Sequence, residues 1–250
     1  MIVLITGATS GFGEAAAKKF IEQGDQVIGT GRRKERLEKF RRELGPAFHP
    51  LAFDVGNRQH VEKALGQLPS AIAAVDVLVN NAGGAIGLDP AQSAQLDDWD
   101  AMIDSNIKGL VYCTRLLLPG MIERGRGHVI NIGSVAGMWP YPGGNVYGAA
   151  KAFVRQFSLN LRSDLLGTPV RVTDIEPGLA GGTEFSQVRF KGDEKRAAAV
   201  YQGTDPLTAE DIADAIYWVA TRPAHVNINT IEMMPVCQAF APLSVKRKSS

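Results

Sequence analysis

The amino-acid sequence predicts an α/β fold, in which a doubly wound parallel sheet carries helices on both faces. Short apolar runs recur along the chain without strict alternation of polar residues, which is typical of strands buried on both faces. Between these runs lie stretches whose apolar residues are three and four positions apart, which is the spacing of a helix face. Because strands and helices alternate from one end of the chain to the other, the pattern indicates βαβ units.

The expected elements follow in order along the chain. The apolar runs predict strands at 2–5, 26–30, 51–53, 75–79, 128–132 and 170–175. The longest amphipathic stretch, at 146–166, predicts a helix with one apolar face. No linker, repeat or low-complexity tract divides residues 1–250, so we expect a single domain. The segment at about 178–207 is polar, charged and glycine-rich, and we expect it to form a lid over the substrate.

The composition argues against several classes of protein. The chain has 250 residues, with 27 Lys and Arg against 26 Asp and Glu, so we expect no nucleic-acid partner. Cys113, Cys237 and the four histidines are scattered, so we expect no metal site and a reducing compartment, the cytoplasm. The start of the chain lacks the features of a secretory signal, and no apolar run is long enough to span a membrane. The basic stretch at 246–248 is interpreted as a solvated tail.

A glycine-rich loop directly follows the first predicted strand. The sequence TGATSGFG runs from Thr6 to Gly13 and precedes an expected helix. Glycines in such a loop let the backbone approach a pyrophosphate and place its charge at the helix N-terminus. An ordinary strand-to-helix turn is the alternative, but the position in the first βα unit favours a dinucleotide site of the Rossmann type. The residues expected to bind the dinucleotide here are Gly7, Ala8, Thr9, Ser10, Gly11, Phe12 and Gly13.

The end of the second strand indicates which dinucleotide binds. An NAD site usually has an Asp or Glu there for the ribose hydroxyls, whereas an NADP site has an Arg for the 2′-phosphate. The sequence has Arg32 and Arg33 at this place, and the first carboxylate is Glu35. A solvated basic helix start is the alternative, but two cations beside the positive end of a helix favour a bound anion. We therefore expect NADP(H).

Further motifs occur in register along nearly the whole chain. They are NNAG at 80–83, Asn106 in DSNIKG, Ser134 in NIGSVAG, the pair Tyr147 and Lys151 in YGAAK, and the turn formed by Pro177 and Gly178. Together with TGATSGFG, this set resembles the short-chain dehydrogenase/reductase family. The stretches at 133–190 and 223–236 are similar to one group in that family, the NADP-dependent 3-hydroxy acid dehydrogenases.

The resemblance implies a catalytic role for four residues. Tyr147 would be the acid–base that exchanges a proton with the reacting oxygen, and Ser134 would hydrogen-bond that oxygen. Lys151 would bind the nicotinamide ribose, and Asn106 would hold a water that leads to Lys151. A cation about 4 Å from a phenol is worth about 4 kcal/mol at an effective dielectric of about 20. We therefore also expect Lys151 to lower the pKa of Tyr147 by roughly three units.

The resemblance also extends the cofactor site beyond the glycine loop and the two arginines. It implies that Tyr147 and Lys151 contact the cofactor as well as the substrate. It implies adenine-side contacts from residues after the third and fourth strands, and nicotinamide contacts from residues after the sixth. These additional residues are Asp54, Val55, Asn81, Ala82, Gly83, Pro177, Gly178, Leu179 and Thr183.

The substrate implied by the resemblance is a small 3-hydroxy acid that reacts at C3, such as serine, allo-threonine or 3-hydroxypropionate, whose oxidised form is malonic semialdehyde. Ser134 and Tyr147 would hold the reacting oxygen, and we expect Arg189 of the lid to bind the carboxylate through two parallel hydrogen bonds. Lys191 is a second candidate for this anchor. The alternative for both is a solvated charge on the lid.

Two other functions remain open at this point. One is a carbonyl reductase for larger substrates, such as ketoacyl thioesters, sugars or steroids. The other is a non-catalytic NADP-binding sensor, although a sensor has no need of Asn106, Ser134, Tyr147 and Lys151 together. The resemblance further implies a homotetramer.

Overall fold

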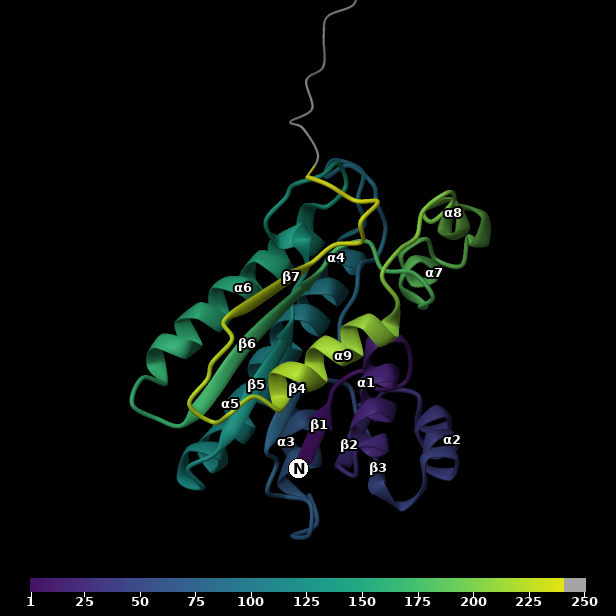
Figure 1. The fold of residues 1–250 in the computed structure, drawn as a ribbon. Helices are drawn as coiled ribbons and strands as arrows, with labels where there is room; N and C mark the ends of the chain where they lie inside the picture. The colour runs from purple at the N-terminus through teal and green to yellow at the C-terminus, as the bar shows by residue number, and fades with distance from the viewer. Residues whose placement is uncertain (241–250) are drawn as a thin grey trace, which may run out of the picture.

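Residues 1–240 are described by the computed structural model, which places a seven-stranded sheet in this range (Figure 1). The basic stretch at 246–248 lies outside the described residues. Every strand pairs in parallel, in the order β3-β2-β1-β4-β5-β6-β7. The order reverses between β1 and β4, which is the kind of point where open α/β sheets bind ligands. The strands are β1 (Ile2–Ile5), β2 (Gln26–Gly31), β3 (Phe48–Ala52), β4 (Val77–Asn80), β5 (Gly127–Ile132), β6 (Val170–Pro177) and β7 (Thr230–Met233).

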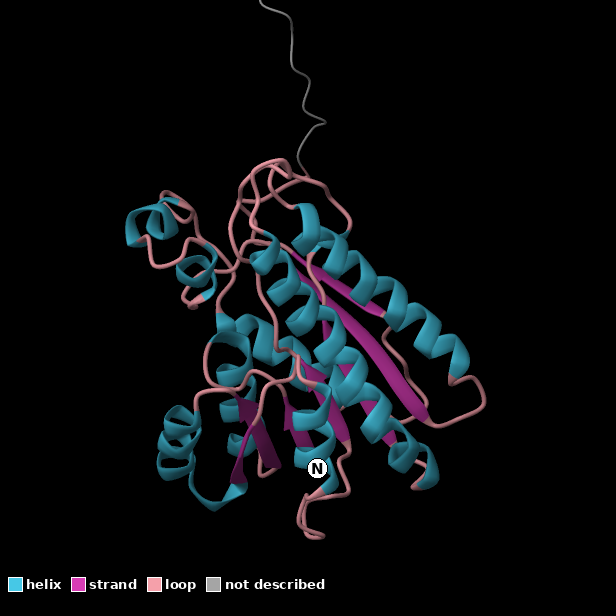
Figure 2. Cartoon of the chain, turned by 180° about the vertical axis from the view of Figure 1, so that it is seen from behind, coloured by secondary structure: helices cyan, strands magenta, loops and turns pink. Residues whose placement is uncertain are grey.

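Helices cover both faces of the sheet, as the two opposite views in Figures 1 and 2 show. Each face has its own apolar cluster, and neighbouring residues of one strand alternate between them: Val3 and Ile5 belong to one cluster and Leu4 to the other. The helices packed into the first cluster are α1 (Gly11–Glu22), α2 (Lys34–Leu44) and α9 (Ala209–Ala220). Those packed into the second are α3 (Arg58–Gly66), α5 (Gly109–Glu123) and α6 (Asn145–Asp164).

The predicted fold class is confirmed. The bounds of β2, β4, β5 and β6 differ from the prediction by one or two residues, and two other strands differ more. β3 begins at Phe48, before the predicted start, and it includes Pro50. Proline is tolerated there because β3 lies at an edge of the sheet. β7 has no counterpart among the predicted strands, because its four residues are half-buried or exposed and carry no continuous apolar run.

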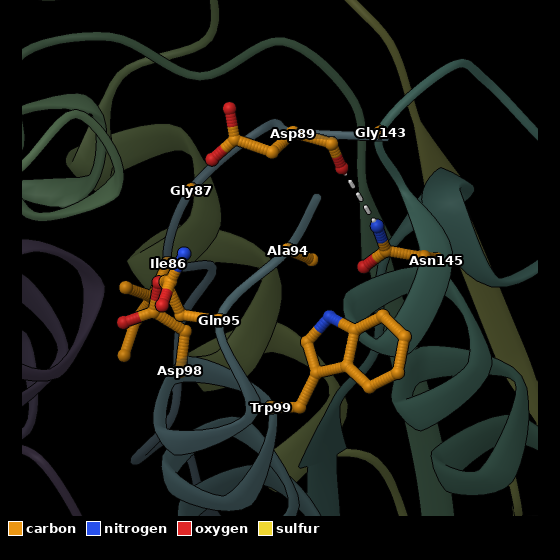
Figure 3. A pocket seen from close by; sticks show the side chains of 9 residues that line it. All are labelled: Ile86, Gly87, Asp89, Ala94, Gln95, Asp98, Trp99, Gly143 and Asn145. Atoms are coloured by element: carbon orange, nitrogen blue, oxygen red, sulfur yellow. Dashed lines mark hydrogen bonds between the residues drawn. The ribbon is translucent and has the colours of Figure 1, made fainter. Parts of the chain in front are cut away.

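The segment at 178–207 contains two short helices, α7 (Phe185–Arg189) and α8 (Glu194–Ala199), which stand to one side of the sheet (Figure 1). This segment contacts both the loop that follows β4 and the first turn of the next helix, α4 (Leu96–Ile103). The Gly87 amide donates to the Arg189 carbonyl at 2.8 Å, and Lys191 Nζ lies 2.7 Å from Asp98 Oδ2. Gly87 and Asp98 also line a cavity of about 10 Å³, shown in Figure 3, which has room for about one water.

The helix α4 (Leu96–Ile103) continues through a π-helical turn, η2 (Asp104–Lys108), into α5. Asn106 lies in the middle of this turn and is buried. Turns of this kind are rare and are frequently found at functional sites. Within residues 1–240 no helix combines the length and the hydrophobicity that crossing a membrane requires.

Candidate active site

The sequence motifs converge at the carboxyl edge of the sheet. The glycine loop follows β1, Asn81 follows β4, Ser134 follows β5, and Gly178 follows β6. These four strands are adjacent in the sheet. The site therefore lies beside the point where the strand order reverses, as expected for a nucleotide cleft.

The glycine loop has the close approach that a pyrophosphate needs. A Cβ atom at Gly13 would overlap the carbonyl oxygen of Gly7, so a larger residue would close the loop. Asn81 Nδ2 holds the loop by donating to the carbonyls of Thr6 and Gly7 at 2.9 and 3.2 Å. Ser10 is the N-cap of α1 but its side chain makes no cap hydrogen bond, which leaves the first amides of the helix for an anion. The loop fits a dinucleotide.

Two arginines at the start of α2 lie over this loop. Arg33 Nη2 donates to Thr9 Oγ1 at 2.9 Å and to Ser10 Oγ at 3.2 Å. Arg36 Nη1 donates to the Thr9 carbonyl at 3.2 Å. Both guanidinium groups also bind the Glu184 carboxylate, at 2.8 Å from Arg33 and 2.6 Å from Arg36, and these bonds lower the pKa of Glu184. The two guanidinium groups thus hold a carboxylate of the chain itself at the place expected for the 2′-phosphate.

Arg36 and Glu184 were not among the residues expected at this site, and Arg32 lies differently from its neighbour. Arg32 is exposed and makes no hydrogen bond or ion pair to residues 1–240, whereas Arg33 contacts the loop. The signal that could have found Arg36 is its spacing from Arg33, because three residues in a helix return to the same face.

The remaining expected cofactor residues line the same edge. Asp54 Oδ1 accepts from the Gly56 amide at 3.0 Å, and Val55 is buried against Gly109. The Ala82 amide donates to Thr6 Oγ1 at 2.9 Å, and Gly83 lies against the Asn106 side chain. The Leu179 amide donates to Gln238 Oε1 at 2.7 Å. Thr183 packs on Gly11, which joins the segment at 178–207 to the glycine loop.

Tyr147 is buried at the first turn of α6, with 8% of its surface exposed. Burial raises the pKa of Tyr147 to about 12, while the Ser134 hydroxyl and the Arg189 guanidinium act in the opposite direction. The expected net lowering of the Tyr147 pKa by roughly three units is wrong for this structure, where the pKa is raised. Burial outweighs the nearby groups, and the phenol is protonated at neutral pH.

Lys151 lies on the same face of α6 as Tyr147, one turn further on. Its Nζ is 5.7 Å from the centroid of the Tyr147 ring, further than the separation of about 4 Å assumed for a strong effect. The ammonium donates to the Ile132 carbonyl at 2.8 Å. Burial lowers the pKa of Lys151 to about 8, and the Asp174 carboxylate opposes this change. The lysine is therefore close to losing its charge in the neutral range.

Ser134 and Asn106 flank this pair. Ser134 Oγ accepts from the Ala136 amide at 3.1 Å and donates to the Pro177 carbonyl at 3.4 Å. Asn106 Nδ2 donates to the carbonyls of Gly84 and Met102, both at 2.9 Å. Asn106 Oδ1 is buried and has no hydrogen-bond partner within residues 1–240. A buried amide oxygen in this state can accept from a water.

The helix α7 brings two side chains, Phe185 and Arg189, which are one turn apart, near Tyr147. The Phe185 ring centroid lies 5.8 Å from that of Tyr147. The Arg189 guanidinium lies 6.0 Å from the Tyr147 centroid and 5.3 Å from the Tyr141 centroid. Arg189 also donates to Tyr141 Oη at 2.9 Å and to the Gly87 carbonyl at 3.3 Å. The expected substrate residue is thus over the phenol, and Phe185 and Tyr141 join it there.

Lys191, the second candidate for the carboxylate anchor, is placed elsewhere. Its ammonium forms an ion pair with Asp98, and the residue has a positive φ of 53°. No carboxylate within residues 1–240 pairs with Arg189. Of the two candidates for the carboxylate anchor, the guanidinium is the one that lies near the phenol.

Comparison with known proteins gives close matches over the whole chain. The family model described as short chain dehydrogenase matches residues 1–194. An NADP-dependent 3-hydroxy acid dehydrogenase of Salmonella typhi is 64% identical over 247 residues, which is 99% of this chain and 100% of that protein. A serine 3-dehydrogenase of Agrobacterium fabrum is 55% identical over 247 residues, covering 99% and 98% of the two chains.

A solved structure is also nearly superimposable on this one. The closed form of a serine dehydrogenase complexed with NADP+ has a TM-score of 0.98 and 62% identity, and the match covers 99% of this chain and 100% of that one. The family match and these identities lead to one conclusion. The chain belongs to the short-chain dehydrogenase/reductase family.

Proposed function

We propose that this chain is an NADP-dependent oxidoreductase that transfers a hydride between the nicotinamide and C3 of a small 3-hydroxy acid. The expected substrates are serine, allo-threonine or 3-hydroxypropionate, and malonic semialdehyde in the reverse direction. The names of the relatives from Salmonella typhi and Agrobacterium fabrum support this substrate class. The NADP+ bound to the serine dehydrogenase supports the cofactor.

The observation that carries the substrate proposal is the position of Arg189 above Tyr147. The guanidinium stacks near the phenol and has no carboxylate partner within residues 1–240. A 3-hydroxy acid has its carboxylate two bonds from the reacting carbon, so one end can meet Arg189 while the C3 oxygen meets Tyr147. A short substrate has little other binding energy to position it, which makes such an anchor valuable.

The cofactor proposal depends on the arginines at the start of α2. Arg33, with Thr9 and Ser10, would hold the 2′-phosphate, and Arg36 would add a second guanidinium. The glycine loop would hold the pyrophosphate at the N-terminus of α1. When bound, NADP+ supplies the acceptor for the hydrogen that leaves C3 with its electron pair.

The protein side chains would handle the proton. In oxidation, Tyr147 Oη takes the proton of the C3 hydroxyl while Ser134 hydrogen-bonds the same oxygen. Because burial raises the pKa of Tyr147 to about 12, the phenol is ready to donate in reduction but must be assisted in oxidation. The Lys151 ammonium is the nearby cation that can stabilise the phenolate. Phe185 would close the site against water.

An assay of cofactor oxidation and reduction tests this function. The purified protein is given serine, allo-threonine or 3-hydroxypropionate with NADP+ or NAD+, and the reduced cofactor is followed by absorbance. A ketoacyl thioester, a sugar and a steroid with NADPH form the comparison set. We expect turnover of the 3-hydroxy acids with a strong preference for NADP+. Turnover confined to the larger carbonyl compounds would contradict the substrate class, and no turnover with any compound would favour the sensor.

We also propose that the protein is a homotetramer. Large apolar side chains are exposed along α5 and α6: Leu116 and Ile122 at 39% and 40%, and Phe153 and Leu159 at 36% and 40%. Exposed apolar patches of this kind mark association surfaces. Sedimentation at micromolar concentration should give four times the mass of 26.8 kDa, and a monomer would contradict the proposal.

The proposed compartment is the cytoplasm. The two cysteines are unpaired, and Cys113 is buried, which raises the pKa of its thiol to about 12 and leaves it unreactive. Fractionation of cells that produce the protein tests this placement. Recovery outside the cytoplasmic fraction would contradict it.

A further inference from the structure

Two carboxyl groups lie buried in β6 beneath the active-site lysine. Asp174 and Glu176 are each 1% exposed, and because they are two residues apart they face the same side of the sheet. Val172 faces this side as well, and it packs with Leu161 and Leu165. The helix α6 therefore covers this side of the sheet. Neither carboxyl group has a part in the chemistry described above.

The two carboxyl groups differ in their partners. Both oxygens of Glu176 accept from Arg155 Nη1, at 2.9 and 3.0 Å. Neither oxygen of Asp174 has a hydrogen-bond donor within residues 1–240. A buried polar group without a partner is costly and needs an explanation.

Lys151 and Asp174 meet at the peptide that joins Ile132 to Gly133. The Lys151 ammonium donates to the Ile132 carbonyl at 2.8 Å. A Cβ added to Gly133, the second residue of this peptide, would lie only 2.5 Å from Asp174 Oδ1. The ammonium and the carboxyl group therefore approach the same peptide unit, and both residues are buried.

We propose that Asp174 is a positioning residue that, once ionised, acts as the buried counter-ion of Lys151 and holds its ammonium charged beside Tyr147. Glu176 and Arg155 set the charge of Asp174 in turn. The inference rests on the proposed function, in which Lys151 assists Tyr147.

The charges around this pair explain how it would respond to pH. Burial and the Glu176 carboxylate raise the pKa of Asp174, while Lys151 and Arg155 lower it. On the neighbouring strand, Glu232 is the register partner of Glu176 and is exposed. From α6, Tyr147 adds a group that is neutral until high pH. As the pH rises and Asp174 loses its proton, the new negative charge retains the proton on Lys151.

Two isosteric variants should therefore move the titration of Lys151 in opposite directions. Asp174→Asn removes the counter-ion and should lower the pKa of Lys151 by about one unit or more. Glu176→Gln removes the charge that keeps Asp174 protonated, so Asp174 ionises earlier and the pKa of Lys151 should rise. The measurement is the pH titration of the lysine Cε signals by NMR in lysine-labelled protein, with the Lys151 signal assigned from its loss in Lys151→Met.

The same shifts should appear in catalysis. The alkaline limb of the pH profile of kcat/KM for oxidation should move to lower pH in Asp174→Asn and to higher pH in Glu176→Gln. An unchanged Lys151 titration in Asp174→Asn, or shifts of the same sign in the two variants, would overturn the proposal. Thermal unfolding and the Kd for NADPH check that each variant is folded.

The design keeps this proposal separate from the proposed function. If Asp174→Asn does not fold, Arg155→Met takes its place, because it raises the pKa of Asp174 and should lower that of Lys151; a rise would overturn the proposal. The NMR titration needs no turnover. A protein that lacks activity on 3-hydroxy acids but shows both titration shifts would contradict the substrate class and support the counter-ion.

Discussion

Replacing Arg189 by Met should separate charged from uncharged substrates. The guanidinium uses two of its donors within the protein, one for Tyr141 and one for the Gly87 carbonyl, and its Cζ lies 6.0 Å from the centroid of the Tyr147 ring. Met keeps much of the apolar stem over the two rings but removes every donor. The loss should therefore fall on a substrate that carries a carboxylate.

The structure limits the size of this loss. Removing a hydrogen bond to a charged group costs about 1.5–3 kcal/mol, which is roughly ten- to a hundredfold in kcat/KM. Arg189 is only half-buried, and part of its fork is already engaged by Tyr141, so a full bidentate pair is not at stake. We expect a decrease of about thirtyfold for 3-hydroxypropionate, near the middle of that range.

The assay compares kcat/KM for 3-hydroxypropionate with that for the propanediol in which a hydroxymethyl group replaces the carboxylate. Arg189→Met should impair the acid and spare the diol. Lys191→Met is the matched control, because Lys191 lies on the same segment but pairs with Asp98. This control should change both substrates by the same factor. Equal losses on acid and diol in Arg189→Met would refute the reasoning and show that Arg189 supports only the lid.

Three further perturbations test other parts of the site. Tyr147→Phe loses only a hydroxyl, so turnover should fall to background while the Kd for NADPH, measured by fluorescence, stays nearly unchanged; Lys151→Ala should weaken both, and wild-type kcat in the Phe variant would require another route for the proton. Arg33→Ala and Arg36→Ala should each raise the Kd for NADPH several-fold and leave the Kd for NADH unchanged, because NADH has no 2′-phosphate for the arginine to bind. Equal effects on both cofactors would contradict the phosphate site. Since the pKa of Asp174 is raised in the folded protein, the folded state binds more protons than the unfolded state from about pH 4 upward, and the free energy of unfolding should fall as the pH rises toward 8. Chemical denaturation at several pH values should show a smaller fall in Asp174→Asn, and an identical slope would count against the raised pKa.

The parts of the fold that the sequence predicts well are those whose signal is local. β1 and β4 consist almost entirely of apolar residues that the fold buries, so composition alone identifies them. β7 lies at the sheet edge with partly exposed side chains, and its pairing with β6 depends on residues more than fifty positions away. No local pattern encodes such a contact.

The same division applies to the site. Tyr147, Lys151 and Ser134 lie close along the chain, so their spacing predicts that they meet. Glu184 reaches Arg33 across 151 positions, and no motif predicts that encounter. The sequence also could not predict whether the pKa of Tyr147 is raised or lowered. The direction depends on how deeply the fold buries the phenol and on which group the Lys151 ammonium contacts.

Glu184 pairs with the same two arginines that are proposed to bind the 2′-phosphate, so the carboxylate and the phosphate compete for them. An anion that binds both guanidinium groups in place of Glu184 breaks the two ion pairs that help to connect the segment at 178–207 to the glycine loop. Because such coupling is reciprocal, the Glu184 ion pairs weaken anion binding by the same factor by which the bound anion weakens the Glu184 ion pairs. The affinity for the cofactor then depends on the difference in free energy between the phosphate and the Glu184 carboxylate as partners of the two arginines, so a residue of the segment at 178–207 helps to set how tightly the adenosine end binds.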